Sequence, residues 1–324
     1  MGVTLDGKNG KRKIQVMGIV VIGTTFMDVK GYPLDKYIPA GRNAGRVVEV
    51  HGGVSRNIAE DVANVGLRPT FVSSVDHSGL SADIVARLDA CGCDTTYVRS
   101  CDDGLGMWLA IFDETGDVVA SISRRSNLSS MEQSLVEEGD KIISRADTVC
   151  IEYDVDAPIL ERTLDLAERY GKQVFAVVSN MTIACERRDL LSKVSCLVCN
   201  QQEAGILLSC DLENATPSEM LAVLVERLPQ AGPQSMIVTM GAQGSVFAGM
   251  DGQAGACPAQ KVEVVDTTGA GDAFFAGAAV GLTCGKDLAS ACAIGTRLAA
   301  SVIATEENVC QRFSPQELGI VVPC

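Results

Sequence analysis

The sequence predicts an α/β fold in which helices cover both faces of a mainly parallel sheet. Three observations carry this prediction: short apolar runs typical of buried strands, amphipathic helical segments between them, and a regular alternation of the two along the 324 residues. Strands joined by helices of this length form right-handed βαβ units, whose strands are parallel. A chain of this length also buries a large hydrophobic core.

The elements follow in order along the chain. Residues 1–13 are polar and predict a flexible leader, so the folded domain is expected to span 14–324. The apolar run "IQVMGIVVIG", closed by Gly23, predicts a strand buried on both faces. Further strands are expected at 148–154, 172–179, 197–200 and 235–241, with helices at 157–171 and 218–228.

Two segments depart from this alternation and predict a small flap. Residues 32–51 are rich in loop-forming residues, and residues 107–123 contain two strand-like runs around a turn at Glu114–Gly116, which is typical of a hairpin. We expect both to form an antiparallel lid, built from about 24–51 and 95–125. Such a lid would lie over the carboxyl ends of the main strands, where doubly wound sheets bind ligands.

Composition excludes several classes of function. The net charge of −14 and the pI near 4.6 argue against a nucleic-acid partner. The 13 cysteines lie scattered in apolar segments, and only two histidines are present, so free thiols are favoured over disulfides or a metal site. No signal peptide is recognisable and no apolar run is long enough to span a bilayer. We therefore expect a cytoplasmic protein without a membrane partner.

The stretch "VVDTTGAGDAFFAG" carries the strongest chemical signal. It lies between a strand-like run at 261–265 and an apolar helix at 273–285, so Gly269–Gly271 would form a helix N-terminus that can hold a phosphate or a developing anion. Asp272 stands in the first helical turn, where it could accept the proton of a substrate hydroxyl. A helix cap alone would explain Asp272. A cap does not need Asp266 and Thr268, however, and this second oxygen-rich spot favours a functional site.

A second motif is "HGGVSRNIAEDVANVG". Gly52 and Gly53 would let the backbone come close to a ligand, and a helix is expected from Asn57 to Val65. Asn57 would then point into the cleft at the start of the helix. A glycine turn followed by an asparagine-capped helix explains the same residues equally well.

Three further motifs follow predicted strands. Asp28 lies just past the first strand, at the expected ligand edge of the sheet. Asn200 and Glu203 follow "CLVC", and their amide and carboxylate suit water-mediated contacts to Mg²⁺ and phosphate. Thr239, Gly241 and Gly244 offer a hydroxyl and a glycine bend near a nucleotide. Each motif alone is better explained by a solvated turn, but all of them fall on one sheet edge, which favours a shared site.

These residues resemble the PfkB (ribokinase-like) family of carbohydrate and nucleoside kinases. "DTTGAGDAFFAG" is similar to the C-terminal signature of that family and "GGVSRNIAEDVANVG" to its N-terminal one, and the remaining motifs occur in the family's order from Ile14 onward. The resemblance implies a three-layer α/β/α fold with a β-lid. It also implies ATP as phosphoryl donor, Mg²⁺, K⁺ as a monovalent cation, a small-molecule acceptor and a homodimer.

Carried over residue by residue, the resemblance assigns roles to this chain. Asp272 is the expected catalytic base, with Gly269, Ala270 and Gly271 as the anion hole. Substrate hydroxyls would be bound by Asp28, Gly52, Gly53 and Asn57. Asn200 and Glu203 match the magnesium–phosphate motif, Thr239, Gly241 and Gly244 match nucleotide contacts, and Asp266 and Thr268 match a monovalent-cation site.

Within the family, "MDVKGYP" and "GGVSRNIAEDVANVG" look most like pseudouridine kinases, which implies transfer to the 5′-hydroxyl of pseudouridine. The chain departs from that branch at 123–127, where Arg124 and Arg125 stand, and at Val177–Val178. An arginine such as Arg124 at the end of the lid could bind an anionic or hydroxyl-rich substrate. Another sugar, keto-sugar acid or nucleoside is therefore the alternative acceptor. A catalytically silent sensor that binds a nucleoside or nucleotide is the alternative of another class. A dehydrogenase is disfavoured, because this chain has no G-x-G-x-x-G motif after the first strand.

Overall fold

The computed structural model describes residues 18–116 and 118–321, and its centre is a nine-stranded sheet. The expected leader at 1–13 lies outside the described residues. The strand order is β13-β12-β11-β10-β9-β8-β1-β4-β5, in which β12 pairs in antiparallel fashion with both β11 and β13 and all other neighbouring strands pair in parallel. The strands are β1 (Ile19–Ile22), β4 (Thr70–Val75), β5 (Asp94–Ser100), β8 (Thr148–Glu152), β9 (Gln173–Val177), β10 (Cys196–Asn200), β11 (Ser235–Thr239), β12 (Ser245–Gly249) and β13 (Ala254–Cys257).

Helices cover both faces of this sheet and enclose two hydrophobic cores, which confirms the three-layer α/β/α prediction. The alternation of side chains along β1 divides them: Val20 and Ile22 enter one core, and Ile19 and Val21 enter the other. The first core is covered by α3 (Ser129–Arg145), α4 (Ala157–Arg169), α5 (Met181–Cys185), α6 (Gln201–Leu208) and α7 (Pro217–Ala231). The second is covered by α1 (Val54–Asn64), α2 (Gly79–Cys91), α8 (Ala270–Thr283) and α9 (Leu288–Ile303).

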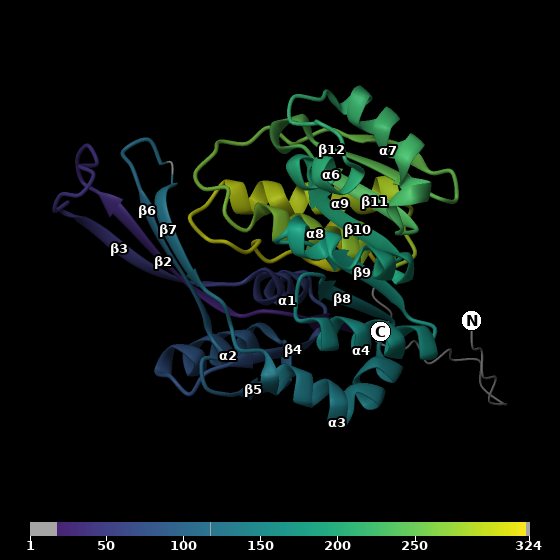
Figure 1. The fold of residues 1–324 in the computed structure, drawn as a ribbon, viewed down its shortest axis with the longest axis horizontal. Coiled ribbons are helices and arrows are strands. Elements are labelled where there is room, and N and C mark those ends of the chain that lie inside the picture. Colours follow the sequence, from purple (N-terminus) through teal and green to yellow (C-terminus); the bar gives the residue numbers. More distant parts are fainter. Residues whose placement is uncertain (1–17, 117, 322–324) are drawn as a thin grey trace.

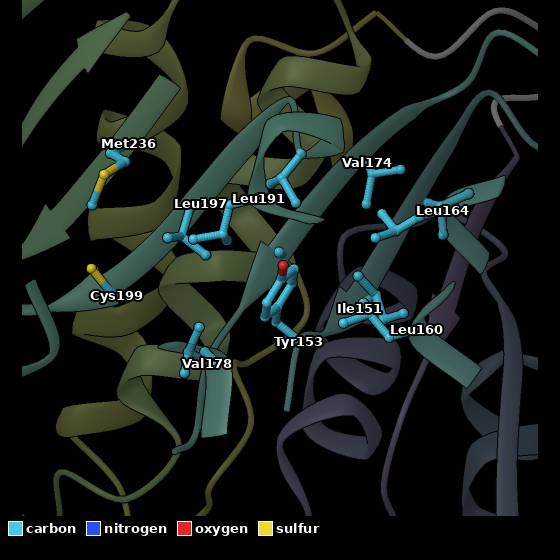
Figure 2. Close-up of a cluster of buried hydrophobic side chains, with 14 of the residues drawn as sticks. Ile151, Tyr153, Leu160, Leu164, Val174, Val178, Leu191, Leu197, Cys199 and Met236 are labelled. Atoms are coloured by element: carbon cyan, nitrogen blue, oxygen red, sulfur yellow. The ribbon is translucent and has the colours of Figure 1, made fainter. Parts of the chain in front are cut away.

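Figure 2 shows how the first core is filled. Ile151 of β8 and Val174 of β9 lie near Leu160 and Leu164 of α4, and each of these side chains is at most 1% exposed. Burying an aliphatic side chain of this size stabilises the native state by about 1.5–3 kcal/mol. The β8–β9 region is therefore anchored by close packing.

A separate four-stranded sheet forms the lid, with the order β3-β2-β6-β7 (Figure 1). Its strands are β2 (Phe26–Pro33), β3 (Gly45–Gly52), β6 (Gly106–Phe112) and β7 (Val118–Arg124). The hairpin around Glu114–Gly116 is confirmed, since β6 and β7 pair in antiparallel fashion. The central pair β2 and β6 is parallel, so the lid is not purely antiparallel.

Three boundaries differ from the sequence prediction. Residues 95–100 belong to β5 of the large sheet rather than to the lid. Residues 261–265 form no strand: Val262, Val264 and Val265 are exposed, and the Val265 N–H donates to the Ile303 carbonyl at the end of α9. Helix α1 begins at Val54 rather than at Asn57, because Gly53, with φ 99°, already turns the chain into the helix.

The described residues also bear on two compositional predictions. All twelve cysteines in the described ranges are free thiols, and half of them are buried. Within those same ranges, no helix combines the length and the apolar character that crossing a bilayer requires.

Candidate active site

The site lies where the carboxyl ends of the parallel strands meet the base of the lid. Thr24 and Thr25 follow β1, Glu152 ends β8, and Asn200 and Thr239 pair with each other at the ends of β10 and β11. Helices α1 and α8 pack against each other and bring their N-terminal turns to the same edge. Residues that are far apart in sequence are thereby gathered at one edge of the sheet.

Asp272 and Asn57 are in direct contact at this edge. The Asn57 Nδ2 donates to Asp272 Oδ2 at 2.8 Å, which joins the first turn of α8 to α1. Asn57 is 3% exposed, so its amide is held in place by packing. The bond leaves the other carboxyl oxygen of Asp272 free to accept a hydrogen bond from a bound hydroxyl.

The turn that precedes Asp272 needs a glycine for a structural reason. Gly269 has φ 80°, and a Cβ at this position would lie 2.0 Å from the Asn308 carbonyl oxygen. The Ala270 N–H donates to Thr267 O, and the Ala273 N–H returns to Gly269 O. The N–H groups between them, of Gly271 and Asp272, are therefore the ones at the helix N-terminus that can face an anion.

Burial raises the pKa of Asp272 from 3.8 to about 7. The Asn57 hydrogen bond and the Arg56 charge lower it, while the negative charges of Glu152 and Asp28 raise it further. A carboxyl group with this pKa exchanges its proton readily near neutral pH, which is the property of a general base.

Asp28 lies opposite, on lid strand β2. Burial raises its pKa to about 6, and the positive charges of Lys30 and Arg56 act in the opposite direction. A Cβ on Gly52 would lie 2.4 Å from Asp28 Oδ2, so the carboxylate occupies the space that a larger residue would fill. Gly52 therefore makes room for Asp28, and Gly53 serves as the N-terminal cap residue of α1.

Arg56, which was not among the residues predicted from the sequence, lies behind this pair and is completely buried. Its Nη1 donates to Asn57 Oδ1 at 3.0 Å, and its Nη2 forms an ion pair with Glu60, which Arg87 also contacts. Arg56 thus orients the amide that contacts Asp272. The signal available in the sequence is an arginine within a helix whose other residues are mostly uncharged or apolar.

A second group of residues that was not predicted from the sequence surrounds Glu152. Its carboxylate accepts hydrogen bonds from the Thr24 N–H at 3.0 Å, the Thr24 hydroxyl at 2.8 Å and the Ser55 hydroxyl at 3.1 Å. Burial raises the pKa of Glu152, and the neighbouring Asp154 adds to this effect. Asp154 in turn accepts from the Ser179 N–H and hydroxyl. A glutamate that ends a buried strand was the signal for this cluster.

Asn200 and Glu203 form a capping box at the start of α6. The Glu203 N–H donates to Asn200 Oδ1 at 2.8 Å, and the Asn200 N–H donates to Glu203 Oε2 at 2.7 Å. Burial raises the pKa of Glu203, and the negative charge of Asp154 adds to this effect. Since Oε2 serves the cap, Oε1 is the oxygen suited to a metal-bound water. In the described ranges, no three His, Cys, Asp or Glu side chains are grouped to bind a metal directly.

Thr239, Gly241 and Gly244, the residues predicted to contact a nucleotide, lie at or just beyond the end of β11. Thr239 donates to Cys199 O at 3.4 Å beside Asn200, and Gly244 is required by the fold because a Cβ there would meet Cys257 O at 2.1 Å. Gly241 is exposed, with open space where a side chain would be. These positions border the carboxyl end of β11 on the side away from the lid.

The two arginines at the end of the lid point to different partners. The Arg124 Nη2 donates to Leu105 O at 3.0 Å, and its Nη1 pairs with Asp103 at 3.4 Å. The Arg125 Nη2 donates to Asp154 O at 3.5 Å, beyond the end of β8. Arg125 therefore lies nearer to the Glu152 cluster, whereas Arg124 is held by the base of the lid.

Asp266 and Thr268 lie at the start of the turn and contact a lid residue, Lys30. The Lys30 Nζ is 3.3 Å from Asp266 Oδ2 and 3.2 Å from the Thr268 hydroxyl. The Thr268 N–H donates to the other carboxyl oxygen, Oδ1, at 2.8 Å. Lys30 is 2% exposed, so this is a buried ammonium group.

Comparison with known proteins shows that the chain is similar to carbohydrate and nucleoside kinases. The profile of the pfkB family carbohydrate kinases matches residues 17–311. The chain is 32% identical to guanosine-inosine kinase of Exiguobacterium acetylicum, over 90% of this chain and 95% of that protein. It is 26% identical to pseudouridine kinase of Escherichia coli K12, over 81% and 82%.

Solved structures show the same fold. The ribokinase of Giardia lamblia superposes with a TM-score of 0.81 at 17% identity, covering 94% of this chain and 99% of that one. Arabidopsis thaliana ribokinase, solved with ribose and ATP, superposes with a TM-score of 0.79 at 20% identity and the same coverage. The ribokinase-like architecture is thus confirmed.

Proposed function

Because the chain belongs to the pfkB family of carbohydrate kinases, we propose that it transfers the γ-phosphoryl group of ATP to the 5′-hydroxyl of a ribonucleoside. The observation that carries this proposal is the Asp272–Asn57 contact at the N-terminus of α8, where a general base and free N–H groups lie together. A hydroxyl nucleophile needs the base, and the transferred phosphoryl group needs the N–H groups.

Each residue has a defined part in this reaction. Asp272 accepts the proton of the attacking hydroxyl, and its pKa near 7 suits that exchange at physiological pH. Asp28 accepts hydrogen bonds from the ribose hydroxyls. The N–H groups of Gly271 and Asp272, together with the α8 dipole, face the negative charge of the phosphoryl group. The lid holds Asp28 over the site and excludes water from it.

Magnesium and ATP would be held on the other side of the site. Asn200 and Glu203 are suited to hold hydrated Mg²⁺ through its waters. When bound, the ion neutralises the phosphate charges. Thr239, Gly241 and Gly244 border the space that the nucleotide would occupy.

The acceptor we favour is a purine ribonucleoside. The relative with 32% identity over nearly the whole chain is named for guanosine and inosine, whereas the pseudouridine kinase is 26% identical over a shorter span. The departures at 123–127 and Val177–Val178 also set this chain apart from the pseudouridine pattern. Pseudouridine is the second candidate, supported by the motifs around Asp28 and Asn57.

The test is ADP release with Mg-ATP across guanosine, inosine, pseudouridine, uridine, ribose, fructose and 2-keto-3-deoxygluconate. We expect kcat/KM for guanosine or inosine to exceed that for the sugars at least tenfold, with a 5′-monophosphate as product. Selective turnover of pseudouridine would make pseudouridine, rather than a purine ribonucleoside, the favoured acceptor. Turnover of sugars alone would refute the nucleoside proposal, and binding without turnover of any acceptor would support a sensor.

The lid also supports the proposal of a homodimer. Leu109 of β6 and Ile122 of β7 lie opposite each other on the lid face that points away from Asp28 and Lys30, beside Val29 of β2, which packs against the second core. Leu109 is 40% and Ile122 71% exposed. An apolar face of this kind is suited to pair with a second lid. Light scattering after size-exclusion chromatography tests this proposal, and a monomer at micromolar concentration would contradict it.

A further inference from the structure

The contact between Lys30 and Asp266 bears on the monovalent cation that the sequence resemblance implies. A K⁺ ion next to the anion hole would need the oxygens of Asp266 and Thr268 as ligands. Each of these oxygens already has a partner: Asp266 Oδ2 and the Thr268 hydroxyl face Lys30 Nζ, and Asp266 Oδ1 accepts the Thr268 N–H. The residues present therefore do not fit a K⁺ ion at this position.

The fold explains how a lysine reaches this spot. Alternate residues of β2 share one face, so Lys30 lies on the same side as Asp28 and two residues farther along the strand. Its neighbours across the lid are Val48 and Ala110, and the fully buried Ala110 leaves room for the long side chain. The 2%-exposed lysine thus extends from the lid to the turn before α8.

The charges around Lys30 are those that a buried cation requires. Lys30 forms an ion pair with Asp266, and its positive charge acts to lower the pKa of both Asp28 and Asp266. For Asp266, burial alone would raise the pKa, but the Thr268 N–H and hydroxyl together with Lys30 outweigh it and hold the pKa below its usual value. Asp266 is therefore ionised at neutral pH and pairs with a positive charge. A second cation within a few ångströms of the ammonium would be repelled strongly at this low-dielectric site.

We propose that the Lys30 ammonium takes the place of a monovalent cation beside the anion hole, so that phosphoryl transfer by this chain needs no K⁺. This inference rests on the proposed kinase function. Lys30 acts through Asp266 and Thr268 on the turn that ends at Gly269, and it is a positioning residue. Since Lys30 belongs to the lid, the positive charge reaches the anion hole only when the lid is in place.

The first experiment uses the unchanged protein. Turnover and thermal stability are measured in KCl and in tetramethylammonium chloride at equal ionic strength, because the tetramethylammonium ion is too large for a K⁺ site. We expect kcat values within twofold of each other and no difference in Tm. A saturable rise in kcat of tenfold or more with K⁺ would overturn the inference, as would a K⁺-specific rise in Tm.

The second experiment removes the ammonium with Lys30→Met, which keeps the length of the side chain. In tetramethylammonium chloride we expect the kcat of this variant to fall at least tenfold, with a smaller change in KM. In KCl we expect its kcat to rise again by at least threefold and its Tm to increase. Lys30→Arg keeps the charge and should remain independent of K⁺. Lys36→Met, the same change at an exposed lid position, should behave like the unchanged protein.

The outcomes separate this inference from the function on which it rests. A folded Lys30→Met variant that is as active as the parent without K⁺ would overturn the inference, and so would one whose lost activity K⁺ cannot restore. If Lys30→Met does not fold, the unchanged protein and Lys30→Arg decide the question. If no acceptor is phosphorylated, the proposed function fails, but the comparison of Tm values still reports whether K⁺ binds.

Discussion

Replacing Asp272 by asparagine should lower turnover by orders of magnitude and at the same time stabilise the protein. The side chain is partly buried, and its loss of contact with water raises the pKa of the carboxyl group from 3.8 to about 7. Asparagine has nearly the same shape and can still accept the hydrogen bond from Asn57, but it carries no charge and cannot act as a base. The substitution therefore separates the chemical role of the side chain from its cost to folding.

The size of the stabilisation follows from the shift in pKa. One pKa unit corresponds to about 1.4 kcal/mol, so ionising Asp272 in the native protein costs about 4 kcal/mol relative to the unfolded chain. Below pH 3.8 the carboxyl is protonated in both states and costs nothing. Between about pH 4 and pH 7 only the unfolded chain ionises, so native stability falls as pH rises, and above pH 7 the full cost persists. The asparagine variant should gain roughly 2 kcal/mol at pH 5 and about 4 kcal/mol at pH 8.

The assay is urea unfolding of both proteins at pH 5 and pH 8, combined with ADP release at pH 8. Loss of a general base should lower kcat by about 10²–10⁴-fold, while binding of the acceptor, measured by calorimetry, should change little. Asp35→Asn, an exposed lid carboxylate, is the matched control and should change neither property. Turnover within tenfold of the parent, or the same stability difference at both pH values, would refute the reasoning.

Three other predictions concern the same site. The kcat/KM should rise with pH through about 6 to 7, as Asp28 and Asp272 lose their protons, and then level off; a flat profile between pH 5 and pH 8 would contradict this. Gly52→Ala should raise the KM for the acceptor tenfold or more, because its Cβ would displace the Asp28 carboxylate, whereas Gly79→Ala, with nothing within 4 Å, should leave KM unchanged. Arg56→Met should cost about 3–5 kcal/mol in urea unfolding, since it breaks a buried ion pair. It should also move the rise in kcat/KM to higher pH, because the Arg56 charge lowers the pKa of both carboxyls; an unmoved profile would speak against that role.

The sequence allowed the sheet, the lid hairpin and the position of Asp272 to be predicted, because each depends on a local pattern. Alternating strands and helices determine the layers, and the glycine-rich turn before an apolar helix marks the N-terminus of α8, with Asp272 in its first turn. The contact between Asn57 and Asp272 could not be predicted in the same way. It joins residues 215 positions apart and depends on the packing of α1 against α8.

The errors have physical causes of the same kind. Residues 261–265 have the β-branched, alternating pattern of a strand, but no sheet edge is available to them, and the Val265 N–H pairs with the end of a helix instead. In the sequence, Glu152 appears only as part of a buried strand. Its role could not be predicted from that pattern, because its hydrogen-bond partners Thr24 and Ser55 come from other segments of the chain. Buried polar groups are defined by their partners, and single-sequence patterns do not give the partners.

The way the lid joins the body has a kinetic consequence. Strand β2 follows β1 after only Gly23–Thr25, and β3 runs through Gly53 directly into α1. Gly23 lets this junction close tightly, since a Cβ there would lie 2.0 Å from the Ser55 hydroxyl. Asp28 and Asn57 flank the junction, so in the proposed reaction the segment that bends when the lid opens would also be the segment that binds the acceptor. Product release would then require the same backbone motion that breaks these contacts, and we expect substitutions here to change affinity and opening rate together.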